Sequence, residues 1–212
     1  MAALVARSGA PSVVVVEAQA AWAHDFSALR ARLWPAVRAC ALAVEHVGST
    51  AVPGLAAKPI IDIDVVVADG AALEQCIALL AAASYEHRGE LGIPGRHAFK
   101  RAPGADAGEG PPLPRHNLYV CLQGALSLRN HLALRDWLRT HPEDVRAYAQ
   151  LKRELAARFP RDIDSYVEGK TAFITGILQR AGAVSEAEAQ QLERQNELLS
   201  QQLQRLNAAK TT

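Results

Sequence analysis

The sequence predicts an α/β protein of the α+β kind, with a small mixed β-sheet, flanking helices, a C-terminal helical bundle and a terminal coiled-coil-like helix. Three observations predict this architecture. Short β-branched segments alternate with helical periodicity in the first half of the chain, which is typical of helices packed on a sheet. From residue 126 onward the apolar spacing is helical only. The polar segment 185–210 repeats leucine every seven residues, which is typical of a coiled coil.

Length and charge limit the possible classes of protein. The 212 residues, half of them hydrophobic, suffice for one buried core, which we place in residues 13–182 with 185–210 as an appendage. The 23 basic and 22 acidic residues give a formal charge of +1. Nucleic acid is therefore not indicated as a partner, because no overall positive field attracts it.

The cysteines and the apolar runs bear on location. Three cysteines lie far apart without a C-x-x-C pair, which favours buried thiols in a reducing compartment. No apolar run approaches the roughly 20 residues that a membrane helix needs, and the N-terminus lacks a signal-peptide pattern. We expect a soluble, cytoplasmic protein with no membrane partner.

In the sheet-forming half, local composition distinguishes the expected strands from the expected helices. β-branched runs predict strands, apolar residues at helical spacing predict helices, and a Gly/Pro-rich stretch predicts a long hairpin loop. The expected strands are 13–16, 42–47, 60–67, 85–87, 97–101 and 117–122; the expected helices are 19–40 and 71–83; the loop is 102–114.

The second half is expected to be helical. Helices are predicted over 126–140, 142–159 and 163–181, with Gly182 as the stop. In the tail, leucines at heptad d positions accompany Asn196 at an a position, where asparagine often fixes a parallel two-stranded register. A homodimer through this helix and a frayed or intramolecularly packed helix both remain open.

Two carboxylates on the most β-prone strand are the first candidate site. Asp62 and Asp64 stand at i and i+2, so they share one face of the strand. Burying two like charges among Ile and Val is unfavourable without a cation, and hard oxygen ligands favour Mg²⁺ or Mn²⁺. The alternative is that one aspartate caps a loop and the other is exposed.

A turn upstream could hold phosphate. Gly48, Ser49 and Thr50 follow a strand and offer free backbone N–H groups and hydroxyls of the kind that bind phosphate. Lys58 is held extended before Pro59, and its ammonium could reach a triphosphate or remain solvated. No P-loop or dinucleotide fingerprint is present. We expect an NTP or another phosphate-bearing small molecule as ligand.

Several motifs together resemble the GrpB family (UPF0157) of bacterial proteins over about residues 14–181. The similar stretches are EHVGSTAVPGL at 45–55, KPIIDI at 58–63, HNLYV at 116–120, LRDWLR at 134–139, residues 148–152, Tyr166 and Lys170. The resemblance implies a fold of the nucleotidyltransferase superfamily. It also implies that Gly48 and Ser49 bind nucleotide and that Asp62 and Asp64 bind the metal.

The chain departs from active nucleotidyltransferases in one respect. A third carboxylate on a later strand usually helps to bind the catalytic metal, and the corresponding segment here begins with His116. His116 could be a ligand or general base, or a hydrogen-bonded structural residue. Alternation places it with Leu118 on one face and Asn117 with Tyr119 on the other.

Residues outside the turn and the aspartate strand are further candidates for the site. Glu45 and His46 lie on opposite faces of their strand, so only one can face the pocket. Lys170 and Arg135 lie on helices and either project into the cleft or are solvated, and Tyr166 shares the helix face of Lys170.

The residues support two functions. One is a metal-dependent nucleotide-binding protein, with Asp62, Asp64 and His116 as catalytic groups in nucleotidyl transfer from an NTP to an unknown acceptor. The other is a non-catalytic binding or folding-accessory module, as expected for domains resembling GrpB that are fused to dephospho-CoA kinase.

Overall fold

A computed structural model describes residues 12–105, 113–190, 194 and 198. Its centre is one mixed five-stranded sheet in the order β1-β2-β5-β4-β3. β2 and β5 are parallel, and the other neighbours are antiparallel. The strands are β1 (Ala41–Val47), β2 (Ile61–Val67), β3 (Tyr85–His87), β4 (Arg96–Arg101) and β5 (His116–Leu122). The α/β class with a mixed sheet is confirmed.

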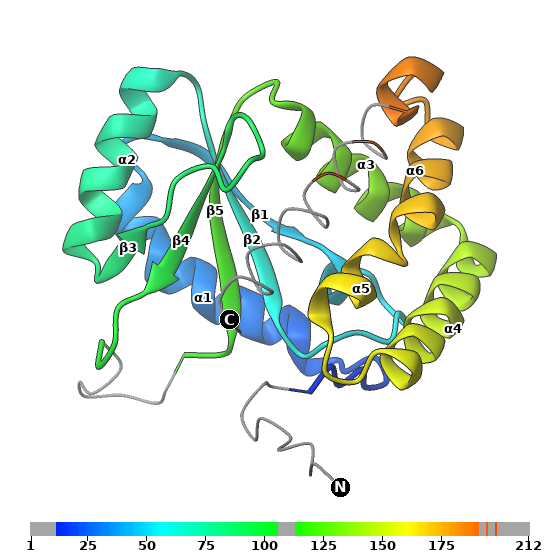
Figure 1. Ribbon diagram of the computed structural model, residues 1–212. Coiled ribbons are helices and arrows are strands. Elements are labelled where there is room, and N and C mark those ends of the chain that lie inside the picture. The colour runs from blue at the N-terminus through cyan, green and yellow to red at the C-terminus, as the bar shows by residue number, and fades with distance from the viewer. Residues whose placement is uncertain (1–11, 106–112, 191–193, 195–197, 199–212) are drawn as a thin grey trace, which may run out of the picture.

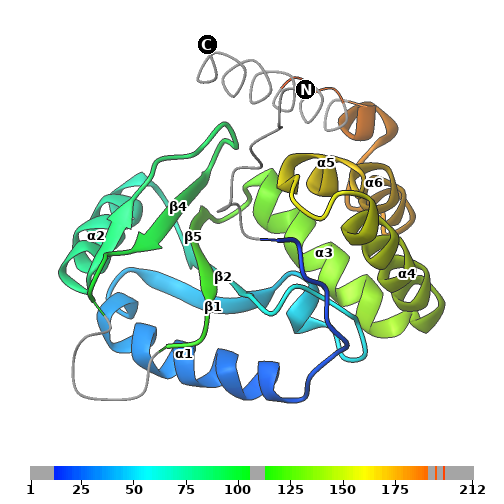
Figure 2. The same ribbon diagram turned by 60° about the horizontal axis from the view of Figure 1, so that its bottom comes forward.

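The helices form two groups around this sheet. α1 (Ala21–Val37) and α2 (Gly70–Ala82) pack on one face. α3 (Leu126–Thr140) crosses the other face beside β1, and Figure 1 shows α4 (Pro142–Arg158), α5 (Ile163–Glu168) and α6 (Thr171–Arg180) gathered next to it. Figure 2 shows α1 and α3 on opposite sides of β1 and β2. The predicted helical bundle is thus present beside the sheet.

The main core lies between the sheet and α1 with α2. Ile63 and Val65 of β2 and Leu29 of α1 are fully buried there. Because side chains alternate along a strand, Asp62 and Asp64 face the other way, toward α3. A second core joins Leu138 of α3 and other residues of the bundle to the loop after β1.

Two predicted elements are corrected by the structure. Residues 13–16 form no strand, because Val16 meets only Ala57 of a loop in an isolated bridge and no ladder can extend from it. The helix predicted over 163–181 is divided into α5 and α6 at Gly169 and Lys170. Leu155 packs so close to Gly169 that a Cβ there would collide with it, so the break is fixed by packing as well as by the low helix propensity of glycine.

The start of the C-terminal helix is anchored to the bundle. Ser185 and Glu188 form a capping box, in which Glu188 Oε2 accepts from the Ser185 N–H at 2.7 Å. Ala189 is buried against Leu178 of α6, and Arg129 of α3 pairs with Glu188. Leu192, Asn196 and most of the predicted heptad lie outside the described residues, so the homodimer and the division near residue 185 stay predictions.

Within the described ranges, no helix combines the length and apolar character that crossing a membrane requires. The cytoplasmic location stays a prediction.

Leu29 offers a test of the main core. Leu29→Ala should lower the free energy of unfolding by about 3 kcal/mol, because it removes a fully buried side chain and leaves a cavity. The matched control Leu42→Ala, at a leucine that is 54% exposed on β1, should change it by less than about 0.5 kcal/mol. Urea unfolding measures both. Equal losses in the two variants would contradict this placement of the core.

Candidate functional site

The site begins at the turn after β1, where backbone conformation demands glycine. Gly48 has φ of 70°, which an L side chain rarely adopts, and a Cβ there would collide with the Asp62 carboxylate. The short 3-10 helix Ser49–Ala51 follows. The turn can therefore lie directly against β2 only because residue 48 has no side chain.

Buried polar contacts hold this turn on the side that faces α1. His46 Nε2 lies 3.0 Å from Thr50 Oγ1, and the Thr50 hydroxyl lies 3.3 Å from the Ile60 carbonyl oxygen, to which it donates. The His46 ring stacks on Phe26 of α1 at 4.5 Å between centroids. The hydroxyl of Thr50 is thus committed to the fold, although the residue lines the cavity described below.

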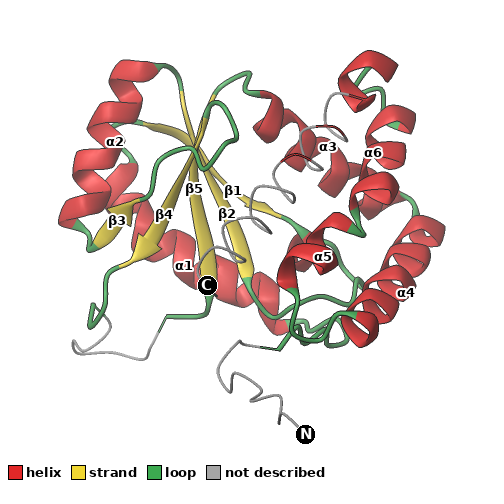
Figure 3. Cartoon of the chain, in the orientation of Figure 1, coloured by secondary structure: helices red, strands yellow, loops and turns green. Residues whose placement is uncertain are grey.

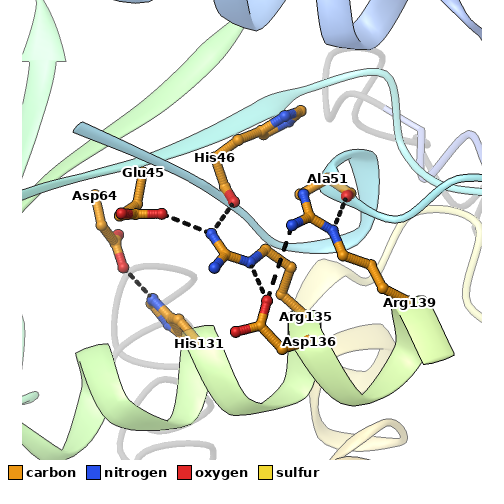
Figure 4. A network of polar contacts seen from close by, with 8 residues as sticks. All are labelled: Glu45, His46, Ala51, Asp64, His131, Arg135, Asp136 and Arg139. Atoms are coloured by element: carbon orange, nitrogen blue, oxygen red, sulfur yellow. Dashed lines mark hydrogen bonds and ion pairs between the residues drawn. The ribbon is translucent and has the colours of Figure 1, made fainter. Parts of the chain in front are cut away.

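Two arginines of α3 fix the same turn from the side of that helix (Figure 4). Arg135 Nη1 donates to Glu45 Oε2 at 2.7 Å and to the His46 carbonyl at 3.1 Å. Arg139 Nε donates to the Ala51 carbonyl at 3.0 Å. Both ends of the turn are therefore positioned by α3, and Glu45 is held in an ion pair.

The two aspartates share the face of β2 that looks toward α3. Asp64 is fully buried, and its Oδ2 lies 2.7 Å from His131 Nδ1. Asp62 Oδ1 accepts from Asn117 Nδ2 at 2.7 Å. Burial raises the pKa of Asp62, while the hydrogen bond from Asn117 and the charge of His131 act in the opposite direction. Each carboxylate thus has one oxygen engaged by a neighbouring side chain.

The remaining carboxylate oxygens fit the Mg²⁺ ion that the family resemblance implies. Asp64 Oδ1 is buried and has no hydrogen-bond partner among the described residues, and hard oxygen donors suit Mg²⁺. In the described part of the chain, no group of three His, Cys, Asp or Glu side chains is arranged to hold a metal ion. An ion at Asp62 and Asp64 would complete its shell with phosphate oxygens and water.

Three lysines surround the open side of Asp62. Lys152 of α4 is only 2% exposed, and its Nζ donates to Ser49 Oγ at 3.0 Å. Burial, and next the charges of Lys170 and Arg153, lower the pKa of Lys152 to about 7. Burial and the charge of Lys58 lower the pKa of Lys170 to about 8, against the opposing effect of Asp62. Lys58, Lys152 and Lys170 thus line one cavity, in which Asp62 is the acid among the lining residues.

Aromatic rings hold the lysines in place. Lys58 Nζ and Lys170 Nζ lie 5.6 and 4.7 Å from the centroid of the buried Tyr166 ring. Lys152 Nζ lies 4.5 Å from the Tyr148 ring centroid. Cation–π contacts of this kind orient ammonium groups and leave their N–H donors available to a ligand.

The lysines and Asp62 line a cavity of about 320 Å³, which we call the lysine cavity. Its walls also include Ser49, Thr50 and Asn117. A hollow of about 170 Å³ adjoins it through the shared residues Ser49, Asp62 and Lys170 and extends to His131 and Arg135. Three ammonium groups facing one accessible carboxylate favour an anionic ligand.

The structure brings most of the predicted residues together. Gly48, Ser49, Asp62, Lys58 and Lys170 meet at the lysine cavity or its adjoining hollow. Whether they bind a nucleotide stays a prediction.

His116 lies elsewhere, on the core-facing side of β5, with Nε2 2.8 Å from Tyr85 Oη and Nδ1 2.8 Å from the Pro114 carbonyl oxygen. The register explains this position, because Asn117 is the residue paired with Asp62.

Four further residues of the site were missed from the sequence. Lys152 interrupts an apolar helical stripe between Tyr148 and Leu155, which is a signal that could have found it. His131 precedes Arg135 by one turn of the same helix. Asn117, Tyr148 and Lys152 lie in stretches that resemble the family, but no role in the site was assigned to them from the sequence, because their positions depend on strand register and on how the bundle packs.

Fold and site together define a mixed α/β protein with a lysine-lined cavity beside two carboxylates of one strand. The sequence pattern of the family described as GrpB protein matches residues 12–180. The chain belongs to the GrpB family.

Individual relatives agree with this assignment. The crystal structure of the conserved protein GrpB from Enterococcus faecalis is 34% identical, with a TM-score of 0.68, and the match covers 79% of this chain and 96% of that one. The UPF0157 protein YqkA of Bacillus subtilis is 36% identical over 72% of this chain and 42% of its own length. A dephospho-CoA kinase of Mycolicibacterium paratuberculosis is 30% identical over 66% of this chain and 39% of its own. The chain therefore spans less than half of these two relatives.

His46 gives a pH test of the turn. Burial, and next the charges of Arg139 and Arg135, lower its pKa from 6.5 to about 4. Between pH 6.5 and 4 the unfolded chain therefore binds a proton that the folded chain does not, so the free energy of unfolding falls as the pH falls, by roughly 2–3 kcal/mol from this residue.

The difference between wild type and His46→Gln isolates that contribution in urea unfolding at several pH values. His24→Gln, at an exposed histidine of α1, is the control and should retain the wild-type slope. An unchanged acid slope in His46→Gln would show that the ring is not held neutral by the fold.

Proposed function

We propose that this chain binds a nucleoside triphosphate, with the phosphates in the lysine cavity and Mg²⁺ as counter-ion. The convergence of Lys58, Lys152 and Lys170 around one accessible carboxylate carries this proposal. Compact ammonium groups bind phosphate as point charges. Partly buried lysines with lowered pKa values gain a partner when an anion binds, so binding removes an unfavourable feature of the free protein.

Each group has a distinct role in the proposal. Lys152 and Ser49, already hydrogen-bonded to each other, contact one phosphate, and Lys170 with Lys58 contact the next. Asp62 and Asp64 would hold Mg²⁺, which would offset part of the negative charge of the phosphates and of the two carboxylates. Arg135 and Arg139 contribute indirectly by holding the turn that carries Ser49.

A more specific version of this proposal is that the bound nucleotide takes part in nucleotidyl transfer. In that reaction an acceptor oxygen bonds to the α-phosphorus, the bond to the leaving pyrophosphate breaks, and the acceptor proton passes to a base. The described part of β5 offers the neutral Asn117 beside Asp62 where a third carboxylate would stand. The geometry therefore supports binding better than transfer.

A folding-accessory module is the second candidate, and one observation favours it. The dephospho-CoA kinase relative matches this chain over only 39% of its own length, so a domain of this kind occurs within a larger enzyme. On this alternative the chain acts on a partner without changing a nucleotide. Incubation with α-labelled NTPs and candidate hydroxyl acceptors separates the two, because only transfer moves the labelled α-phosphate onto the acceptor and releases unlabelled pyrophosphate.

Lys152 provides the sharpest test of the lysine cavity. Lys152→Met should weaken binding of ATP and of tripolyphosphate at least about tenfold, because it removes a desolvated cation that meets phosphate. The same change should not lower the unfolding midpoint of the free protein, since a buried charge is replaced by an apolar side chain of similar length.

Calorimetric titration at fixed salt measures the two affinities. Arg146→Met is the matched control, because Arg146 is an exposed cation on the same helix that does not line the lysine cavity. Equal affinities in wild type and Lys152→Met would refute phosphate binding in this cavity.

Asp62 tests the role of Mg²⁺. If the ion bridges carboxylates and phosphates, then Asp62→Asn and excess EDTA should each weaken ATP binding at least about tenfold, as loss of a metal–phosphate contact predicts. Glu143→Gln, at an exposed acid on the first turn of α4, makes the same change of charge and should have no effect. Tighter binding in Asp62→Asn, with no dependence on Mg²⁺, would show that the lysines bind phosphate without a metal.

A further inference from the structure

A second and larger hollow lies on the sheet beside the lysine cavity. It has a volume of about 590 Å³ and runs along β4 and β5; we call it the strand groove. Ala98 and Tyr119 are register partners, so their side chains lie on the same face. Their neighbours Phe99 and Leu118 point into the core on the other face. No described helix covers the groove side of β4 and β5 in Figure 3.

The groove continues into the lysine cavity. Asn117 and Tyr119 line both spaces. Burial raises the pKa of Tyr119, and the negative charge of Asp62 adds to the increase. The tyrosine therefore stands at the junction, close to the carboxylate that the lysines surround.

The groove has an aromatic and apolar floor with a basic rim. The Arg96 guanidinium lies 4.5 Å from the Tyr119 ring centroid, and the small, largely buried Ala98 stands beside Tyr119 as its register partner. Lys100 and Arg115 are exposed at the rim. A planar ring, a short apolar residue and peripheral cations suit a ligand that is flat and attached to negative charge.

We propose that the strand groove holds the nucleoside of the nucleotide whose phosphates occupy the lysine cavity, with the base stacked on Tyr119. This inference rests on the proposed function. The lysine cavity, at about 320 Å³, is near the lower end of the roughly 300–1,000 Å³ of ligand sites, so it takes phosphates while the groove supplies the room for base and sugar. The order along the sheet is then phosphate at Asp62, sugar at Asn117 and base over Tyr119 and Ala98.

Stacking predicts a specific ligand preference. Any base presents a π-face to an aromatic ring, so purine and pyrimidine triphosphates should bind with similar affinity, and each should bind more tightly than tripolyphosphate. The ratio of the tripolyphosphate dissociation constant to that of ATP isolates the contribution of the nucleoside. We expect a ratio of about 5 to 150, the range that one aromatic–base stack provides.

The test measures this ratio by calorimetry in variants of the full chain. Tyr119→Leu removes the ring and should bring the ratio toward one, whereas Tyr119→Phe keeps the ring and should keep the ratio. Ala98→Leu fills the floor and should also bring it toward one. Circular dichroism establishes that each variant is folded. A ratio that Tyr119→Leu and Ala98→Leu leave unchanged would overturn the assignment of the groove while leaving phosphate binding intact.

A second experiment uses the unmodified protein. Photolysis with 8-azidoadenosine triphosphate, followed by peptide mass spectrometry, should place adducts within residues 96–101 or 115–121, and excess ATP should suppress them. Adducts confined to other segments would overturn the inference. Absence of binding by both ATP and tripolyphosphate would overturn the proposed function and this inference together, so the two failures are distinguishable.

Discussion

Two neighbouring carboxylates on one strand, one of them fully buried, are the constraint on which the rest of the site depends. Asp64 is inaccessible to water in the middle of the sheet, and Asp62 stands two residues before it on the same face. Neither could remain there without polar partners, because an unpaired buried charge is strongly unfavourable. α3 supplies His131, β5 supplies Asn117, and the absence of a side chain at Gly48 lets the turn approach. The contacts of α3, β5 and the turn with the two aspartates thus answer one need, which is to give the carboxylates polar partners.

Charge is separated across this site. The carboxylates belong to the sheet. The ammonium groups of Lys58, Lys152 and Lys170 lie across the cavity from it, on the side of α4 and α5. Burial and repulsion between the ammonium groups lower the pKa values of Lys152 and Lys170, and buried charges without a close partner are generally unfavourable. Proteins retain destabilising groups of this kind where they serve function. The tyrosine rings under the ammonium groups restrict the lysines without neutralising them.

Strand register explains which site residues could be predicted. Gly48, Ser49 and the two aspartates are close in sequence, so a turn and one strand suffice to bring them together. The predicted place of His116 in the site depended on how β5 pairs with β2. The observed register places Asn117, one residue further on, beside Asp62. A shift of one residue exchanges the faces of a strand. The same limit applies to residues 13–16, which have a strand-like composition but meet only a loop.

The sequence by itself determined the α/β class, most helices and strands, the shared face of the aspartates and the glycine at the turn, because these follow from local periodicity and backbone sterics. Only the tertiary structure decided that Lys152, 103 residues after Ser49, is hydrogen-bonded to it, and that the strand groove continues into the lysine cavity. Contacts between distant segments depend on how helices pack and how strands pair, and local pattern carries no information on either.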